Sequence, residues 1–465
     1  MKNILILFFG ISTLIFASCK SDNNRGTASQ VIDIDSTKKI IAAPDWSKDA
    51  TIYELNIRQY TPKGTINAVI PHLKKIKDLG IDIIWVMPPY PIGLAKRKGR
   101  LGSPYSIKDY TAINPDMGTK EDFRKFVEEA HRLKMKVILD WVGNHTSFDN
   151  KWVKPHPDWY TKDSLGHITH PKGTDWTDVA DLNYDNKEMR KAMIESMKYW
   201  VKEFDIDGYR CDVAGFVPND FWSEAITELQ KLKHLFMLAE WEDPALHKAG
   251  FHMTYGWELH HIMNEIAKGK MKPLALDTFF DKDFHRFPAE AYRMNFTTNH
   301  DENSWNGTIK ERMGDAGDVM TVLAFTAEGM PLIYSGQEAN LNKRLSFFDK
   351  DTINWSDTSK LGFYKSLMHL HHQNRAVWNG KYGSYLQKID TSNPNIYAYS
   401  REKDGDEVVV FLNLSDKKQF FNILGLSKPD RYYKNIFTGE DKKFSQWIRQ
   451  NKTLKPWGYL VIEKE

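Results

Sequence analysis

The chain has 465 residues, of which 41% are hydrophobic and 13% aromatic, and its 64 basic side chains nearly balance its 61 acidic ones. That length accommodates a large barrel and a smaller domain, and the hydrophobic share excludes an intrinsically disordered chain. The net charge of +3 provides no basic footprint for nucleic acid, and two cysteines are too few for a disulfide scaffold.

The first 18 residues have the features of a signal peptide. Lys2 is followed by an apolar stretch, residues 4–16, that is shorter than a membrane span. Small residues then precede Cys19, which resembles a lipobox and predicts cleavage before this cysteine and its lipidation. The chain would then be an exported, membrane-anchored lipoprotein facing the periplasm or the cell surface. The alternative is an ordinary secretory signal with an incidental cysteine.

Residues 19–45 are rich in Ser, Asp, Asn and Lys and lack periodicity, so we expect a flexible tether. From residue 46 to 375, strand-like runs alternate with helical patterns. The expected strands are 51–56, 81–87, 137–142, 208–213, 236–241, 293–298 and 332–335. The expected helices are 66–79, 121–134, 187–204, 220–232 and 318–328. Repeated strand–helix units over this length predict a closed (β/α)8 TIM barrel.

Two segments depart from this alternation. Residues 145–183, after the third strand, are rich in Trp, His, Pro, Gly and Asp and are expected to form a short inserted lobe. Residues 376–465 change to short alternating strands, which predicts a C-terminal antiparallel β-sandwich domain. The predicted fold class is therefore α/β, with an insertion and an appended β domain.

Carboxylates stand at or just after the ends of four expected strands, and in a barrel these ends share one open face. Arg210 and Asp212 are two residues apart and so point to the same face of their strand, while Cys211 points to the other. A guanidinium beside a carboxylate keeps it ionised, as a nucleophile requires. Glu240 ends an apolar strand, where burial raises its pKa towards the range of a general acid. Two carboxylates in such opposed environments suit retaining glycoside hydrolysis.

These segments resemble four conserved regions of the α-amylase family, glycoside hydrolase family 13. The matching regions are 140–145, 208–212, 240–241 and 296–301, with supporting matches at 103–116, 181–183 and 329–338. The resemblance extends from about Trp46 to the C-terminus. It implies hydrolysis of α-glucosidic bonds, most simply α-1,4, in starch-like glucans or maltooligosaccharides through a covalent glycosyl-Asp intermediate.

Roles carry over residue by residue. The resemblance makes Asp212 the nucleophile, Glu240 the acid and then the base, and Asp301 the stabiliser of the oxocarbenium-like transition state. Arg210 would orient Asp212. The substrate-binding side chains implied in the same way are Tyr105, which would stack beneath the sugar, His145 and His300, which would bind its hydroxyls, and Asp140 in support.

A calcium site is matched only in part. Asn144 matches a usual calcium ligand of the family and Asp175 could be another, since hard oxygen ligands suit calcium. Residues 213–217 lack the Lys-His pair that many members carry after the nucleophile, so the ligand set is incomplete. No organic cofactor is expected. Structural calcium is left as an open alternative.

Ser103 stands where members that trim single glucose units often carry Asp, which favours an open cleft and longer glucans. The lobe tryptophans Trp152, Trp159 and Trp176 could stack on sugars, with packing in the lobe as the alternative. Two other functions stay open: a transglycosylase or a sucrose- or trehalose-acting member with the same catalytic groups, and a non-catalytic glycan-binding lipoprotein.

Overall fold

The computed structural model describes residues 40–425, 430–450 and 452–465. The predicted signal peptide, Cys19 and most of the predicted tether therefore lie outside the described residues. The described chain already packs from Ile41 onwards, because Ile41 and Ala43 lie against hydrophobic clusters of the barrel and the Ala42 carbonyl bonds His234 Nε2 at 3.0 Å. These residues, before the expected boundary at 46, thus already pack against the barrel. None of the helices in these ranges is long and apolar enough to cross a bilayer.

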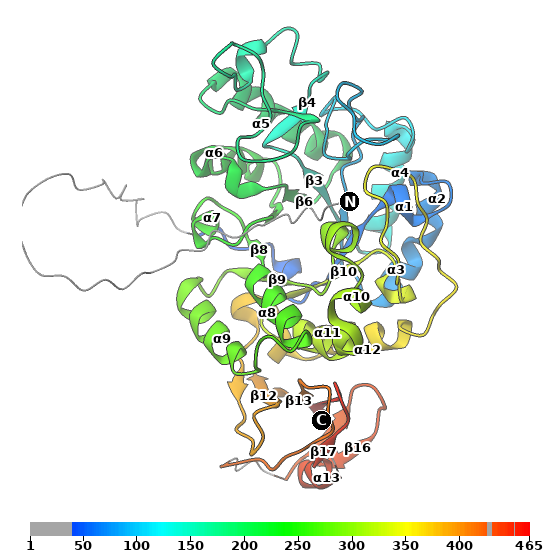
Figure 1. The fold of residues 1–465 in the computed structure, drawn as a ribbon, viewed down its shortest axis with the longest axis vertical. Helices are drawn as coiled ribbons and strands as arrows, with labels where there is room; N and C mark the ends of the chain where they lie inside the picture. The colour runs from blue at the N-terminus through cyan, green and yellow to red at the C-terminus, as the bar shows by residue number, and fades with distance from the viewer. Residues whose placement is uncertain (1–39, 426–429, 451) are drawn as a thin grey trace, which may run out of the picture. The chain divides into compact units, whose positions relative to one another are not determined.

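Eight parallel strands close into the predicted barrel, in the order β1-β10-β9-β8-β7-β6-β3-β2 (Figure 1). They are β1 (Ile52–Leu55), β2 (Ile83–Val86), β3 (Lys136–Trp141), β6 (Gly208–Cys211), β7 (Phe236–Ala239), β8 (Met253–Tyr255), β9 (Tyr292–Asn295) and β10 (Met330–Tyr334). Seven of them overlap the expected runs. The sequence did not reveal β8, because three residues are too few to show a period.

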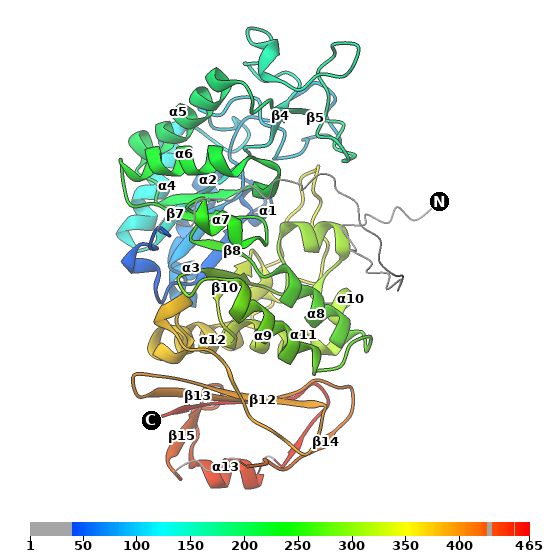
Figure 2. The same ribbon diagram turned by 90° about the vertical axis from the view of Figure 1, so that its left-hand side faces the viewer.

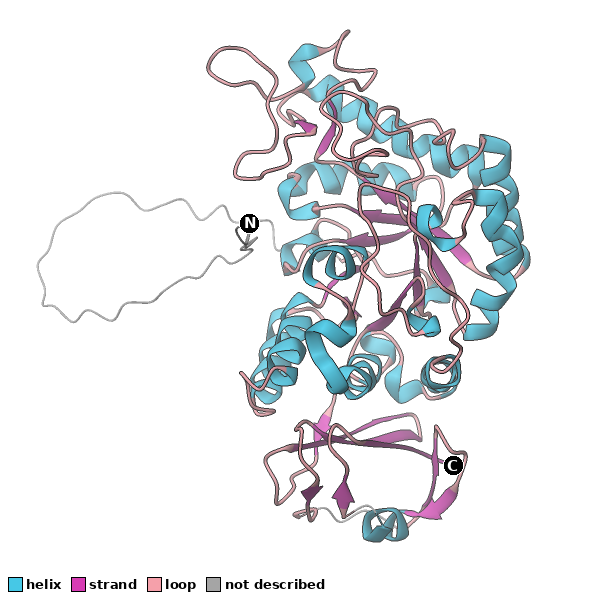
Figure 3. Ribbon diagram, turned by 45° about the vertical axis from the view of Figure 1, so that its right-hand side comes forward, coloured by secondary structure: helices cyan, strands magenta, loops and turns pink. Residues whose placement is uncertain are grey.

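Helices surround this barrel, as the colouring by secondary structure in Figure 3 shows. They are α1 (Ile57–Tyr60), α2 (Ile66–Val69), α3 (Leu73–Leu79), α4 (Lys120–Arg132), α5 (Lys187–Phe204), α6 (Asn219–Gln230), α7 (Pro244–Lys248), α8 (Trp257–Ala267), α9 (Ala275–Arg286), α10 (Ile309–Met313), α11 (Gly317–Thr326) and α12 (Leu361–Gln373). The single helix expected over 66–79 is split by a 3-10 turn, Ile70–His72. Pro71 lies in this turn and has no N–H to continue an α-helix.

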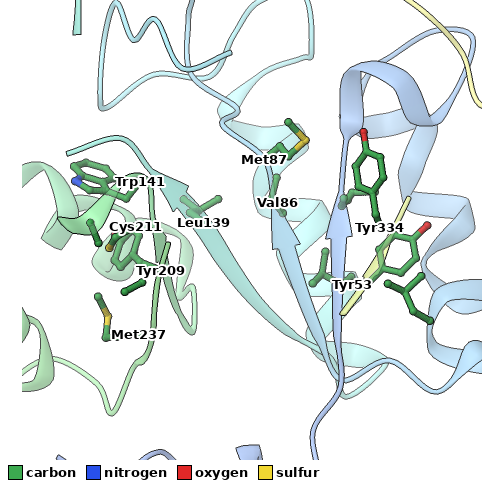
Figure 4. Packing of buried hydrophobic residues seen from close by; sticks show 14 of the residues in the cluster. Tyr53, Val86, Met87, Leu139, Trp141, Tyr209, Cys211, Met237 and Tyr334 are labelled. Atoms are coloured by element: carbon green, nitrogen blue, oxygen red, sulfur yellow. The ribbon is translucent and has the colours of Figure 1, made fainter. Parts of the chain in front are cut away.

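Alternating side chains of the strands divide between two cores. Trp85, Ile138 and Leu238 fill the barrel interior. Tyr209 and Cys211 belong to the other cluster, which lies between the strands and the helices (Figure 4). The alternation therefore leaves Arg210 on the interior side of β6, as the period of two predicts, while Cys211 is fully buried under the helices.

The segment after β3 leaves the barrel where an inserted lobe is expected. It starts with β4 (His145–Ser147), which pairs antiparallel with β5 (Val179–Asp181), and the chain then enters α5. Trp152 and Trp159 are buried, with ring centroids 5.3 Å apart. These two tryptophans pack the lobe, which leaves Trp176 as the partly exposed one.

The C-terminal part is an antiparallel β domain, as predicted (Figure 2). Its six-stranded sheet has the order β11-β12-β13-β18-β15-β16, and β14 and β17 form a second, two-stranded sheet. The elements are β11 (Gln387–Lys388), β12 (Ile396–Lys403), β13 (Asp406–Asn413), β14 (Gln419–Phe420), β15 (Tyr432–Asn435), β16 (Asp441–Lys443), α13 (Phe444–Gln450), β17 (Thr453–Leu454) and β18 (Tyr459–Lys464). One sheet face packs on a core shared with α13, and the other joins the large core around the barrel.

Candidate active site

Four carboxylates and one arginine gather at the carboxyl ends of the barrel strands. Asp140 is on β3, Arg210 on β6 and Asp212 just after it, while Glu240 follows β7 directly. Asp140, Arg210, Asp212 and Glu240 are all buried. Asp301, beyond β9, is the most open of the carboxylates, with 34% of its side chain exposed. The structure thus brings together the groups that the sequence places at separate strand ends.

Arg210 is the hub of this cluster. Its Nη1 donates to Asp140 Oδ1 at 2.7 Å and to Asp212 Oδ1 at 3.0 Å. Its Nη2 lies 2.9 Å from Glu240 Oε2 as an ion pair without hydrogen-bond geometry. The guanidinium carbon lies 4.8 Å from the Trp85 ring centroid, so it is fixed by packing as well as by charge.

Ionisation of both Asp212 and Glu240 is unfavourable. Burial and the charge of Glu240 raise the pKa of Asp212 well above its ordinary range, and Arg210 opposes this shift. Burial also raises the pKa of Glu240, against the same guanidinium. Ionisation of one carboxyl group therefore opposes ionisation of the other. Asp212 accepts a hydrogen bond from Arg210 whereas Glu240 does not, which favours Asp212 as the ionised partner and Glu240 as the acid.

The backbone after the nucleophile candidate holds the acid candidate. Val213 has φ 36° and ψ 49°, a left-handed conformation that is costly for a β-branched residue. In this conformation its N–H donates to Glu240 Oε2 at 2.7 Å. The strained residue thus fixes one oxygen of Glu240.

The predicted substrate ligand His300 lies in a chain of hydrogen bonds. Its Nε2 is 2.8 Å from the Tyr105 hydroxyl and 3.2 Å from Asp301 Oδ2. Its Nδ1 is 2.5 Å from Oε1 of Glu54, a fully buried residue of β1. The sequence reasoning missed Glu54, although it shows the same signal as the other carboxylates, a charged residue near the end of an apolar barrel strand.

Tyr105 is placed beside the same group. Its hydroxyl donates to Asp140 Oδ2 at 3.0 Å, and its ring centroid is 5.3 Å from that of His300 and 6.1 Å from that of Phe347. His300 and Phe347 are themselves 6.4 Å apart, so the three rings form a triangle rather than a sandwich around Tyr105. Phe347 comes from the loop after β10 and had no signal in the sequence beyond being aromatic.

His145 is a neutral member of the site. It is buried at the start of the lobe, and burial lowers its pKa to about 3. Its ring centroid is 5.6 Å from that of Trp176, which in turn lies 6.0 Å from Phe216. Phe216 then contacts Trp241 at 5.5 Å, so an aromatic row leads from His145 to the residue after Glu240.

The side chains expected to bind calcium do not form a cation cage. Asn144 Nδ2 lies 3.2 Å from His145 Nδ1, and Lys98 Nζ donates to the Asp175 carbonyl at 3.0 Å. Lys98 also pairs with Asp178 at 3.1 Å, so an ammonium already stands beside the carbonyl of Asp175. Among the described residues, no three His, Cys, Asp or Glu side chains are grouped to hold a metal.

Residues 93–102, here named the strap, bond to the lobe at one end and to the loop after β10 at the other. At the lobe end, Leu94 N–H donates to the Asp149 carboxylate, and Lys98 pairs with Asp178. At the other end, Leu101 N–H donates to the Phe348 carbonyl at 3.1 Å. The strap leads directly into Ser103, whose hydroxyl accepts from Tyr105 N–H at 3.1 Å.

The site lies at the carboxyl face of a TIM barrel and pairs buried carboxylates around one guanidinium. These features are typical of one class of protein, the glycoside hydrolases with a barrel fold. Residues 16–376 match the family model described as the α-amylase catalytic domain. The chain belongs to the α-amylase family.

Solved structures agree with this assignment. A noncanonic maltogenic α-amylase from Thermotoga neapolitana is 30% identical, with a TM-score of 0.78 over 89% of this chain and 96% of that one. An α-amylase from Lactobacillus plantarum is also 30% identical, with a TM-score of 0.79 over 90% and 99%. Among curated relatives, the α-amylase MalA of Haloarcula japonica is 27% identical over 81% of this chain. The chain spans 57% of the length of that relative.

Proposed function

We propose that this protein is a retaining glycoside hydrolase that cleaves α-1,4-glucosidic bonds in starch-like glucans or maltooligosaccharides. The observation that carries the proposal is the single guanidinium of Arg210 held between Asp212 and Glu240, at 3.0 and 2.9 Å. Burial and the charge of Glu240 oppose this guanidinium at Asp212, and burial opposes it at Glu240, which favours one ionised and one protonated carboxyl, as the double-displacement reaction requires.

In the first step, an Asp212 oxygen attacks the anomeric carbon and forms a glycosyl ester. Glu240 gives its proton to the departing glycosidic oxygen, so the bond to the leaving sugar breaks without release of an alkoxide. In the second step, Glu240 removes a proton from water, the hydroxyl attacks the anomeric carbon, and the ester bond to Asp212 breaks. Asp301 stabilises the positive charge that develops on the sugar, and His300 binds the hydroxyls of the sugar.

The names of the relatives support the substrate class. The similar proteins include α-amylases, a maltogenic α-amylase and a cyclomaltodextrinase of Thermoanaerobacter pseudethanolicus, which is 25% identical over 82% of this chain. The aromatic row of Trp176, Phe216 and Trp241 offers ring faces for a chain of sugars.

The test is a substrate panel with protein lacking the first 19 residues. Maltoheptaose, amylose, cyclodextrin, pullulan, sucrose and trehalose are incubated with enzyme, and proton NMR follows the anomer formed first. We expect shorter maltooligosaccharides released as α-anomers. Products longer than maltoheptaose would instead indicate a transglycosylase, and binding of amylose without new reducing ends would indicate a glycan-binding protein.

We further propose that the protein is exported and anchored through Cys19. The support is the charged start, the short apolar stretch and the small residues before this cysteine. Labelling cells with palmitate should mark the wild-type protein and not Cys19→Ala. Label on both proteins, or on neither, would contradict the anchor.

A further inference from the structure

Glu54 is the buried carboxylate of the mouth to which the proposed reaction gives no role. It is fully buried at the third position of β1. In the closed barrel β1 lies opposite β7, the strand that Glu240 follows. Its Oε1 meets His300 Nδ1 at 2.5 Å, and its Oε2 has no hydrogen-bond partner among the described residues. Burial of a carboxylate is strongly unfavourable unless a charge or hydrogen bonds compensate it. The compensating group here is His300.

The groups around His300 indicate its protonation state. When the Tyr105 hydroxyl gives its proton to Asp140 Oδ2, its oxygen is left as an acceptor for His300 Nε2. Asp301 Oδ2, at 3.2 Å from the same nitrogen, also accepts. Glu54 accepts at Nδ1. Both ring nitrogens therefore face acceptors, and the ring that satisfies both sides is the imidazolium.

We infer that Glu54 is a positioning residue of the reaction: it keeps His300 doubly protonated, so that His300 presents an N–H towards Tyr105 and Asp301 and holds Asp301 as a carboxylate at the sugar. The inference rests on the proposed function. Glu54 acts through His300 and does not itself reach the reacting atoms, since its side chain has no exposed surface.

The charges around His300 act in the same direction. Burial alone would lower the pKa of His300, but Asp301 and Glu54 raise it well above its ordinary value. Burial would likewise raise the pKa of Asp301, but His300 holds it below its ordinary value. Asp140 and Glu240 also face His300 across the mouth, and the charge of His300 acts to lower the pKa of each. Burial raises the pKa of Glu54 as well, and the charges of His300 and Arg210 oppose this shift. The neutral Trp85 ring lies 5.9 Å from the His300 ring.

The test compares Glu54→Gln, Glu54→Asp and a matched control, Glu338→Gln. Glu338 is a buried carboxyl that bonds the hydroxyl of Tyr53, the neighbour of Glu54 in sequence, and it makes no contact with His300. Glutamine keeps the size and an accepting oxygen but removes the charge, so His300 should lose its proton at lower pH. We expect Glu54→Gln to lower kcat about 10- to 100-fold with little change in KM. The alkaline limb of its pH profile should move to lower pH by about one unit or more.

The controls separate charge from structure. Glu54→Asp keeps the charge and should keep the wild-type alkaline limb even where its kcat is lower, and Glu338→Gln should match the wild type in both. Nitrogen-15 NMR of wild-type histidines, with His300 assigned from a His300→Asn spectrum, should show two ring protons on His300 at pH 7. This readout needs neither turnover nor a folded Glu54→Gln variant.

Two results would overturn the inference: a Glu54→Gln profile that overlays the wild type, or a wild-type His300 with one ring proton at pH 7. A wild-type protein that cleaves no α-glucan would refute the proposed function instead. The NMR result would then still decide whether His300 is an imidazolium at pH 7.

Discussion

Asp212 and Glu240 contact the same guanidinium in different ways. The first accepts a hydrogen bond at 3.0 Å, while the second has an ion pair and one backbone N–H, from Val213. A substrate whose leaving group needs no protonation therefore separates their roles. Glu240→Gln should lose about 10²- to 10⁴-fold in kcat on maltooligosaccharides but still form the ester from α-maltosyl fluoride.

Asp212→Asn should lose both reactions, because no ester can form. The measurement is fluoride release alongside reducing-end release for the two variants, with Asp149→Asn in the lobe as a control away from the hub. Equal losses on both substrates for Glu240→Gln would contradict its role as the acid.

Glu338 gives the stability of the fold a pH dependence. Burial raises its pKa from 4.5 to about 7. Between these two pH values the folded state holds the proton that the unfolded chain has lost, so stability falls as pH rises from about 4.5 to 7 and then levels off. The loss is about 3 kcal/mol at most.

Glu338→Gln removes this dependence. Relative to wild type, the variant should gain Tm between pH 4 and pH 8, which thermal melting followed by circular dichroism measures. A difference between variant and wild type that stays constant over this range would contradict the raised pKa.

At the scale of elements, the sequence predicted helices and strands with a clear hydrophobic period and did not reveal those too short to show one. Long amphipathic helices such as α5 (Lys187–Phe204) have a period and match their expected bounds. β8 has three residues and no visible period. The same holds for the site: Asp212 and Glu240 carry motifs, whereas Phe347 reaches Tyr105 only because a loop folds over it. Such contacts between distant segments depend on tertiary packing, which no local pattern records.

One ammonium group joins the strap to the lobe by an ion pair. Lys98 pairs with Asp178, whose side chain is only 6% exposed. Lys98→Met would leave this carboxylate without its cation, and we expect a loss of about 1–2 kcal/mol and faster proteolysis within the lobe. Lys154→Met, an exposed lysine of the same lobe, is the matched control.

The same pairing predicts the response to chelators. Because Lys98 already supplies a positive charge to this region, EDTA should leave the wild-type Tm unchanged. A clear drop in Tm that calcium restores would show that a metal holds the lobe.

At the scale of the whole molecule, one core joins the barrel and the C-terminal sheet. Arg401 of β12 is buried and donates to the carbonyls of Thr326, Ala327 and Ser384. We expect one cooperative calorimetric transition for residues 40–465. Arg401→Met should lower the free energy of unfolding by about 3 kcal/mol or more, because three buried carbonyls lose a charged donor.

Arg431→Met, on the exposed surface of the same domain, is the control for this variant. Two separate transitions in the wild type, with the activity lost in only one of them, would contradict a shared core.

The buried thiol of Cys211 can serve as a probe of local opening of the barrel. It lies fully buried beneath the nucleophile candidate, on the helix side of β6, and burial raises its pKa well above the ordinary value. An alkylating reagent can therefore reach it only when the barrel wall itself opens. In protein lacking the first 19 residues, the rate of alkylation would report how often β6 separates from the helices that cover it. The reporting residue is the one directly before Asp212.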